Sequence, residues 1–320
     1  MGMFLQIWRV LKGVAARLNA RWGNVALHVF RWGVPIALLA FLAYSLTHLG
    51  WLHVWSARPS SPGFYLVLLL PFFVQPVADL IIYRNLLGVG RSLPLSVLLR
   101  KRYMNNIMLD YTGEAYFFFW AKKNLVLRKG VLLHAVKDTN ILSAGAGLAT
   151  VWLMLLALVA NGVMKLPSFF STNSWTIYAI GSLPLVLCLA LIVGGRKVTA
   201  LSRSDVATTF AIHLARSITA LALEFVLWLL SGALPSATVC LEFVALRLLI
   251  TRLPFVPNKE LVFVGVGIAA AGLLDVSAPK VAAVLVIMTA VSLLQEFALV
   301  GLPWFVEQFQ IRHNADEAAP

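Results

Sequence analysis

Three long stretches without a Lys, Arg, Asp or Glu limit what this chain can fold into. They lie between Arg31 and Arg58, from Ile141 to Met164, and from Leu166 to Gly195. A helix of about 20 apolar residues crosses a hydrocarbon core about 30 Å thick. Only helices and closed barrels cross lipid, because unpaired backbone groups are costly there. Since the stretches lack the alternation of barrel strands, we predict an all-α, polytopic membrane protein.

The composition excludes a soluble globular domain. Hydrophobic residues make up 60% of the 320 positions and charged residues 12%, whereas about 25% of a soluble domain is charged. In so apolar a chain, the net charge of +13 indicates contact with an anionic bilayer surface rather than nucleic acid. Cys188 and Cys240 both lie in apolar runs, so we interpret them as small buried hydrophobes and not as a disulfide or metal site.

The apolar pattern predicts about eight membrane spans in a single polytopic domain covering residues 25–310. The seventh has a short charge-free core and fits a half-helix or re-entrant segment as well as a full crossing. The two halves of the domain predict a pseudo-repeat with its boundary near residue 160. The predicted spans are at about 33–51, 63–83, 139–161, 174–194, 206–231, 237–251, 261–275 and 281–304.

The two ends of the chain differ from this domain. Residues 1–24 place apolar side chains at steps of three and four among Arg and Lys, which predicts an interfacial amphipathic helix. A helix packed on a cytoplasmic partner is the alternative. Residues 311–320 are polar and predict a disordered tail. With this span count, 21 of the 26 Lys and Arg fall on one side, which predicts a bacterial-type inner (plasma) membrane protein with both termini cytoplasmic.

Two interrupted segments stand apart from ordinary loops and spans. In the first, a break from Asp110 to Gly113 precedes Glu114 and the apolar, aromatic run from Ala115 to Ala121. This pattern predicts a short helix that enters the membrane and returns, or else a helix lying flat in the cytoplasmic interface. In the second, a proline-containing break precedes Glu260 and a short apolar stretch. Broken helices at corresponding positions of two halves are typical of a transporter's binding site.

The sequences of both segments resemble a known family. LDYTGEAYFFFWAKKNLVLRKGVLLHAVKDTN and LPFVPNKELVFVGVGIAAAGLLDVSAPKVAAVLVIMTAVSLL are similar to two blocks in the membrane region of lysylphosphatidylglycerol synthases and related integral membrane proteins. The resemblance covers roughly residues 64–305. It implies a role in moving or presenting lipids with polar head groups. We expect no synthase activity, because no counterpart of the soluble aminoacyl-transfer domain follows.

Ionisable residues at membrane depth are costly, so each needs a partner or a function. Arg216 and Glu224 are eight residues apart on one predicted helix, and we expect each to pair with another helix or to face a wet cavity. A buried arginine suits a phosphate-bearing head group, which it binds bidentately. We interpret Glu242, Arg247 and Glu296 as ion pairs that hold the bundle together. The candidate substrate-binding residues are Asn105, Asp110, Tyr111, Gly113, Glu114, Arg216, Glu224, Arg252, Asn258 and Glu260.

Motifs of common enzymes and cofactor sites are missing from the sequence. We find no GxSxG, P-loop, HExxH or dinucleotide fingerprint, and the six His residues form no i, i+4 pair. We therefore expect no cofactor, metal or catalytic residue, and favour a lipid transporter or flippase. The alternative is a head-group-modifying enzyme, or enzyme subunit, with Asp110 and Glu114 as acid and base at the cytoplasmic face. A third interpretation is a scaffold that docks a soluble synthase.

The expected partners follow from the same hypothesis. They are the anionic lipids of the inner leaflet and a polar lipid substrate. A soluble synthase or transferase and a second copy of the chain are further candidates, and nucleic acid is not. A continuous polar cavity that reaches both Glu114 and Glu260 would favour transport, whereas a dry, fully paired bundle would favour the scaffold.

Overall fold

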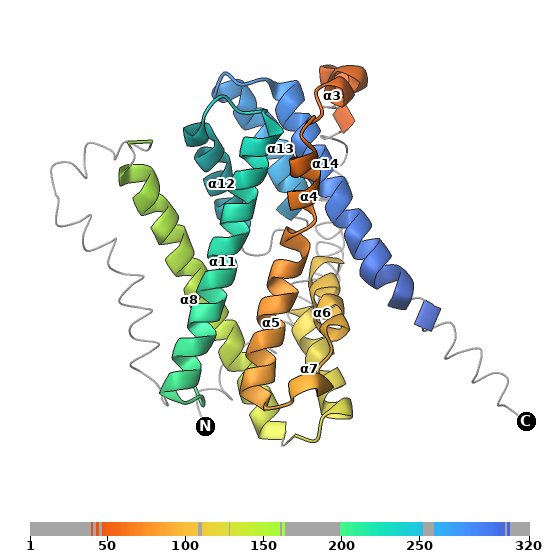
Figure 1. Ribbon diagram of the computed structural model, residues 1–320, viewed down its shortest axis with the longest axis vertical. Helices are drawn as coiled ribbons and strands as arrows, with labels where there is room; N and C mark the ends of the chain where they lie inside the picture. The colour runs from red at the N-terminus through yellow and green to blue at the C-terminus, as the bar shows by residue number, and fades with distance from the viewer. Residues whose placement is uncertain are drawn as a thin grey trace, which may run out of the picture.

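The computed structural model describes residues 40, 43–44, 47–107, 111–127, 129–160, 162–163, 199–251, 259–304 and 306–307. These residues are all-helical, with no strand among them. Figure 1 shows the helices as an upright bundle in which α11 runs the full height. The helices are α3 (Trp51–Ser56), α4 (Pro62–Leu68), α5 (Pro71–Leu87), α6 (Leu95–Ile107), α7 (Thr112–Asn124), α8 (Lys129–Ala160), α11 (Arg203–Ser231), α12 (Ala237–Thr251), α13 (Lys259–Leu273) and α14 (Ala278–Glu296), with short turns of 3-10 helix at Gly90–Ser92 and π-helix at Phe297–Gly301.

Four of these helical segments are long and apolar enough to cross a membrane: Pro62–Leu87, Gly130–Val159, Arg203–Ser231 and Ala278–Trp304. They overlap the predicted spans at 63–83, 139–161, 206–231 and 281–304, so the all-α fold is confirmed and a membrane protein is supported. The predicted span at 174–194 and most of that at 33–51 lie outside the described residues. The segment 1–24 and the tail 311–320 lie outside them too, and the count of eight spans stays a prediction.

The predicted spans at 237–251 and 261–275 correspond to α12 and α13, which have 15 residues each. At 1.5 Å per residue each helix is about 22 Å long, short of a core about 30 Å thick. Helices α6 and α7 are shorter still, with 13 residues each. The described bundle therefore combines long helices with two pairs of short ones. Figure 1 shows α6 and α7 in its lower half and α12 and α13 in its upper half.

Local sequence explains where the long helices begin and end. Ser202 precedes α11, and its side-chain oxygen accepts a hydrogen bond from the Asp205 backbone N–H at 3.1 Å, as an N-cap residue does. Gly88 and Gly232 follow α5 and α11 with φ angles of 63° and 61°, the left-handed conformation in which glycine ends helices. Pro71 lies in the first turn of α5, where its missing N–H costs no hydrogen bond.

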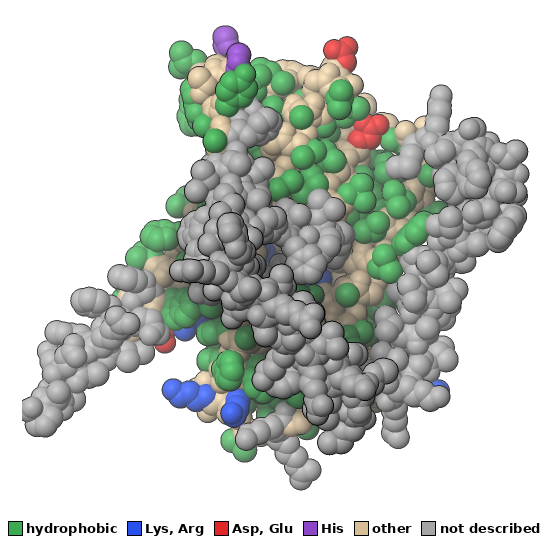
Figure 2. Space-filling model, turned by 180° about the vertical axis from the view of Figure 1, so that it is seen from behind, with side chains coloured by type: hydrophobic (Ala, Val, Ile, Leu, Met, Phe, Trp, Pro, Cys, Tyr) green, Lys and Arg blue, Asp and Glu red, His purple; other side chains and the backbone are tan. Residues whose placement is uncertain are grey.

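Two hydrophobic cores hold the short helices in place. One joins α6 and α7 to α5 and α8 around fully buried side chains that include Tyr83, Leu98 and Phe117. The other joins α12 and α13 to α4, α11 and α14 around Trp228, Phe243 and Phe263. Outside the cores, the described surface seen in Figure 2 is mostly hydrophobic, and the exposed Lys and Arg lie mainly at its lower end. An apolar surface of this kind is expected of a protein embedded in lipid.

Candidate functional site

A cavity of about 370 Å³ lies among helices α4–α6 and α11–α14 of the described part of the chain. Its α11 lining runs from Arg216, at the middle of this 29-residue helix, to Leu227 near its C-terminal end. The segment Pro62–Leu87 contributes residues between Leu68 and Gln75, again near its middle. The cavity therefore lies about halfway along helices that are long enough to cross a membrane. Its charged lining residues are Arg102, Arg216, Glu224, Arg247 and Glu260.

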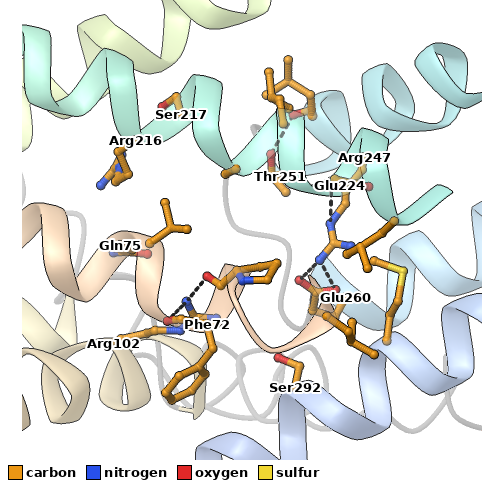
Figure 3. A pocket seen from close by; sticks show the side chains of 18 of the residues that line it. Phe72, Gln75, Arg102, Arg216, Ser217, Glu224, Arg247, Thr251, Glu260 and Ser292 are labelled. Atoms are coloured by element: carbon orange, nitrogen blue, oxygen red, sulfur yellow. Dashed lines mark hydrogen bonds and ion pairs between the residues drawn. The ribbon is translucent and has the colours of Figure 1, made fainter. Parts of the chain in front are cut away.

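One side of the cavity is formed by an acid–base–acid group on α11, α12 and α13. The Nη2 atom of Arg247 donates to both carboxylate oxygens of Glu260, at 2.7 and 2.8 Å. Its Nε atom lies 3.5 Å from the Glu224 carboxylate, and its guanidinium stacks over the ring of Phe263. Two carboxylates thus neutralise Arg247. Figure 3 shows these three charged side chains together on one side of the cavity.

A second acid–base–acid group is buried outside the cavity, on α5, α6 and α7. The Lys101 ammonium lies 2.7 Å from Asp79 and 3.3 Å from Glu114. The Lys101 side chain is only 3% exposed. A buried ammonium needs such partners, because taking an unpaired charge out of water costs several kcal/mol. Asp79 also lies 3.9 Å from Arg216, so this group meets the cavity lining through a carboxylate.

Arg102 and Arg216 lie on the other side of the cavity, away from Arg247 (Figure 3). Arg216 donates to the Ser143 hydroxyl at 3.2 Å and meets Asp79 only at the distance limit of an ion pair. Arg102 donates to the backbone oxygen of Phe72 at 2.8 Å, and its Nε atom has no hydrogen-bond partner among the described residues. A guanidinium has five N–H donors. Both arginines therefore keep donors that these contacts do not use.

The predicted site residues fall into three sets. Arg216, Glu224 and Glu260 line the cavity together. Asn105, Tyr111, Gly113 and Glu114 lie at the turn between α6 and α7, and Glu114 is held by Lys101 rather than lining the cavity. Asp110, Arg252 and Asn258 lie outside the described residues. The polar cavity thus includes Glu260 but not Glu114.

The close contact between α6 and α7 explains the residues found at the start of α7. Tyr111, the residue before α7, has a φ angle of 76°, a left-handed conformation two residues before Gly113. Gly113 is in α7, and a Cβ atom there would overlap the backbone oxygen of Lys101. The side-chain oxygen of Asn105 accepts from the Gly113 N–H at 2.6 Å. Asn105 and Gly113 therefore hold the start of α7 tightly against α6.

Sequence reasoning missed Lys101 and Arg102 as site residues, because the basic run was assigned to the cytoplasmic loops. Successive residues of a helix point 100° apart, so three consecutive cations cannot all face water. In the structure, Arg100 contacts Glu307, Lys101 faces Asp79 and Glu114, and Arg102 lines the cavity. Arg247 was interpreted as structural, yet it also lines the cavity. Three consecutive cations on a packed helix indicate that one of them faces inward, but the sequence does not say which.

Within the described part of the chain, no three His, Cys, Asp or Glu side chains are grouped so as to hold a metal ion. Comparisons with protein-family models, curated proteins and solved structures found no match to this chain. The resemblance to the membrane region of lysylphosphatidylglycerol synthases therefore stays a prediction.

Proposed function

We propose that this protein binds the phosphate-bearing head group of a lipid or lipid-linked carrier in the central cavity and moves it across the bilayer. The observation that carries the proposal is the pair Arg102 and Arg216, which line the cavity and keep N–H donors that their contacts with the described residues do not use. The cavity volume of about 370 Å³ lies within the usual range of ligand pockets, about 300–1,000 Å³.

The energetics of burial support a functional role for these arginines. An arginine at the centre of a spanning helix costs about 2.5–3.5 kcal/mol on insertion scales. Arg247 recovers part of such a cost through two carboxylates, whereas the carboxylates that Arg102 and Arg216 meet among the described residues lie 3.9 Å away. A phosphate supplies several acceptor oxygens that suit the planar guanidinium group. A bound phosphate would satisfy the donors that remain.

The short helices support a path through the membrane. We propose that α6–α7 and α12–α13 are re-entrant hairpins that enter from opposite sides and approach each other at the cavity. Arg102 just past the middle of α6, Thr251 at the end of α12 and Glu260 at the start of α13 all line it. Irregular backbone at membrane depth is tolerated when it lines a wet cavity. If α12 and α13 form one hairpin in place of the predicted sixth and seventh spans, the chain loses two crossings. Because two is an even number, the other spans keep their orientation.

The proposed location and family follow from the sequence. The bias of Lys and Arg supports an inner (plasma) membrane protein with cytoplasmic termini, and the two sequence blocks support a protein similar to the membrane region of lysylphosphatidylglycerol synthases. The enzyme alternative has less support, because Glu114 is ion-paired to Lys101 and lies outside the cavity. Docking of a soluble synthase or a second copy stays a prediction.

Lipid movement in reconstituted vesicles tests the proposal. Purified protein is placed in vesicles that contain a phospholipid with a fluorescent tail, and an impermeant quencher reports how fast the lipid reaches the outer leaflet. We expect the wild-type protein to accelerate this step for phosphate-bearing lipids and not for a glycolipid that lacks phosphate. Arg216→Gln should slow it at least tenfold, because the charge that holds the phosphate is removed.

Arg58→Gln is the matched control. Arg58 is exposed and contacts only Trp55 among the interactions found for it, so its rate should equal that of the wild type. Equal rates for wild type and Arg216→Gln, in samples that unfold at the same temperature, would contradict the assignment of the cavity. A wild-type rate no higher than that of protein-free vesicles would contradict transport itself.

A further inference from the structure

The described helices form two units with the same order of long and short segments. The first is α4–α5, α6, α7 and α8; the second is α11, α12, α13 and α14. In Figure 1 the chain descends along α5 and ascends along α11, so the two units run in opposite directions. The order of one long, two short and one long helical segment is therefore repeated, and the second unit runs in the opposite direction to the first.

The two acid–base–acid groups occupy matching places in the two units. Asp79 on α5, Lys101 on α6 and Glu114 in the first turn of α7 correspond to Glu224 on α11, Arg247 on α12 and Glu260 in the first turn of α13. The acid and base are 22 residues apart in the first unit and 23 in the second, and the base precedes the second acid by 13 in both. A residue in the first long helix of the first unit therefore corresponds to the residue 145 positions later in the chain. In the helices that follow, the shift is 146 positions.

The surroundings of the two groups agree with the same shift. Tyr83 and Trp228 each follow the first acid by four residues, and both are fully buried. Phe117 and Phe263 each follow the second acid by three residues, and both are buried. Each base also lies over a ring of its own unit, Lys101 over Tyr83 and Arg247 over Phe263. Two unrelated salt-bridge groups would not be expected to have buried aromatic residues at the same spacing from their acids.

The cavity lies where the two units meet, but it extends further into the second. Four pairs of corresponding positions line it from both units: Pro71 with Arg216, Phe72 with Ser217, Gln75 with Ala220, and Arg102 with Leu248. Beyond them the lining includes the second unit's Glu224, Arg247, Thr251, Glu260 and Met288. The corresponding residues of the first unit lie outside it: Asp79, Lys101, Asn105, Glu114 and Leu142. The Glu260 side chain is accordingly 46% exposed and that of Glu114 13%.

We propose that the two units are an inverted repeat and that Asp79, Lys101 and Glu114 form a second, occluded site for the same phosphate-bearing head group. Inverted repeats permit two states in which the units exchange their arrangements around a shared site. The structure shows the state in which the cavity opens onto the Arg247 group. In the exchanged state the cavity opens onto the Lys101 group, and the head group that Arg102 and Arg216 hold where the units meet becomes accessible from that side. This inference rests on the proposed function.

Thiol labelling of matched cysteines tests the exchange without measuring lipid movement. Met288→Cys and Leu142→Cys are made separately in a chain whose Cys188 and Cys240 are replaced by alanine, and each is reconstituted in vesicles. A small, water-soluble maleimide is then added. Met288 lines the cavity, whereas Leu142 is fully buried in this state. We expect both cysteines to react, each from the opposite side of the membrane.

Ala135→Cys is the control on the same helix as Leu142. Ala135 is buried in the core of the first hairpin, its counterpart Val281 is also buried, and neither lines the cavity. Ala135→Cys should stay unlabelled. Labelling of Leu142→Cys no faster than that of Ala135→Cys, while Met288→Cys reacts fully, would overturn the second site.

A second pair protects the test against a variant that does not fold. Ser292→Cys and Ala146→Cys are related by the same shift of 146 residues; Ser292 lines the cavity, and Ala146 is fully buried. Reaction of both from opposite sides supports the exchange, and reaction of Ser292→Cys alone overturns it. These outcomes are independent of vesicle lipid movement, so failure of the second site and failure of the proposed function are distinguishable.

Discussion

Arg216 and Glu224 project from the same helix into one cavity, yet each is paired with a different part of the bundle. Arg216 meets Asp79 on α5 at 3.9 Å, and Glu224 meets Arg247 on α12 at 3.5 Å. Helix α11 thus connects the two acid–base–acid groups across the cavity. Substitutions on either side of this connection should have separable effects on stability and on lipid movement.

Removing Lys101 should destabilise the protein more than removing its neighbour. Lys101→Met leaves Asp79 and Glu114 buried without their cation, and breaking a buried ion pair costs about 3–5 kcal/mol. Arg100→Met removes an exposed pair with Glu307, which is worth about 0–1 kcal/mol. Thermal unfolding in detergent should show a large drop in Tm for the first variant only. Adding Asp79→Asn to Lys101→Met should restore part of the loss; equal Tm values for the two single variants would contradict the buried group.

Gly113→Ala should destabilise the turn between α6 and α7. The added Cβ overlaps the backbone oxygen of Lys101, which cannot rotate away as a side chain can. Overpacking of this kind costs about 1–3 kcal/mol. Gly272→Ala in α13 is the control, since a Cβ there meets nothing within 4 Å. A Tm for Gly113→Ala as high as that of Gly272→Ala would show that the helices are not in close contact.

Asn105→Ala should loosen the start of α7, where no side chain of its own caps the helix. The substitution removes the acceptor of the Gly113 N–H bond, and loss of a capping side chain costs about 0.5–2 kcal/mol. Hydrogen exchange at α7 should become faster. Asn105→Asp keeps an acceptor oxygen and should restore protection. Unchanged exchange in Asn105→Ala would contradict the capping role.

Glu224→Gln should slow lipid movement more than Glu242→Gln. Both glutamates lie in the second unit, but only Glu224 lines the cavity and pairs with Arg247. Losing about 1.4 kcal/mol of interaction corresponds to a tenfold change, and we expect an effect of that order on the vesicle rate. Similar rates for the two variants would place the moving head group elsewhere.

The class of fold and the polarity of α11 could be predicted from sequence, because apolar length and buried charge are local signals. Arg216, Glu224 and Glu260 were named in advance and do meet at the cavity. The roles of Lys101 and Arg247 could not be predicted, because their partners lie 13 to 23 residues away on other helices. Which of three consecutive cations faces inward depends on helix packing, and composition carries no information about that.

The bounds of α12 and α13 could also be predicted. The apolar stretches at 237–251 and 261–275 coincide with α12 and lie within two residues of α13, and whether either helix crosses the membrane stays a prediction. Where a helix ends is decided by capping, proline and tertiary contacts, and these shift boundaries by several residues. The break before α7 was placed in the right segment, whereas the function of Gly113 as a contact point required the neighbouring backbone.

Native mass spectrometry of the purified protein tests the central claim most directly, because it reports what the cavity holds. The account predicts that the wild-type protein and Arg58→Gln retain a lipid whose mass and fragmentation show a phosphate-bearing head group. The double variant Arg102→Met/Arg216→Met should lose it while keeping its fold. Retention of the same lipid by the double variant, or binding of a lipid without phosphate by the wild type, would contradict the account.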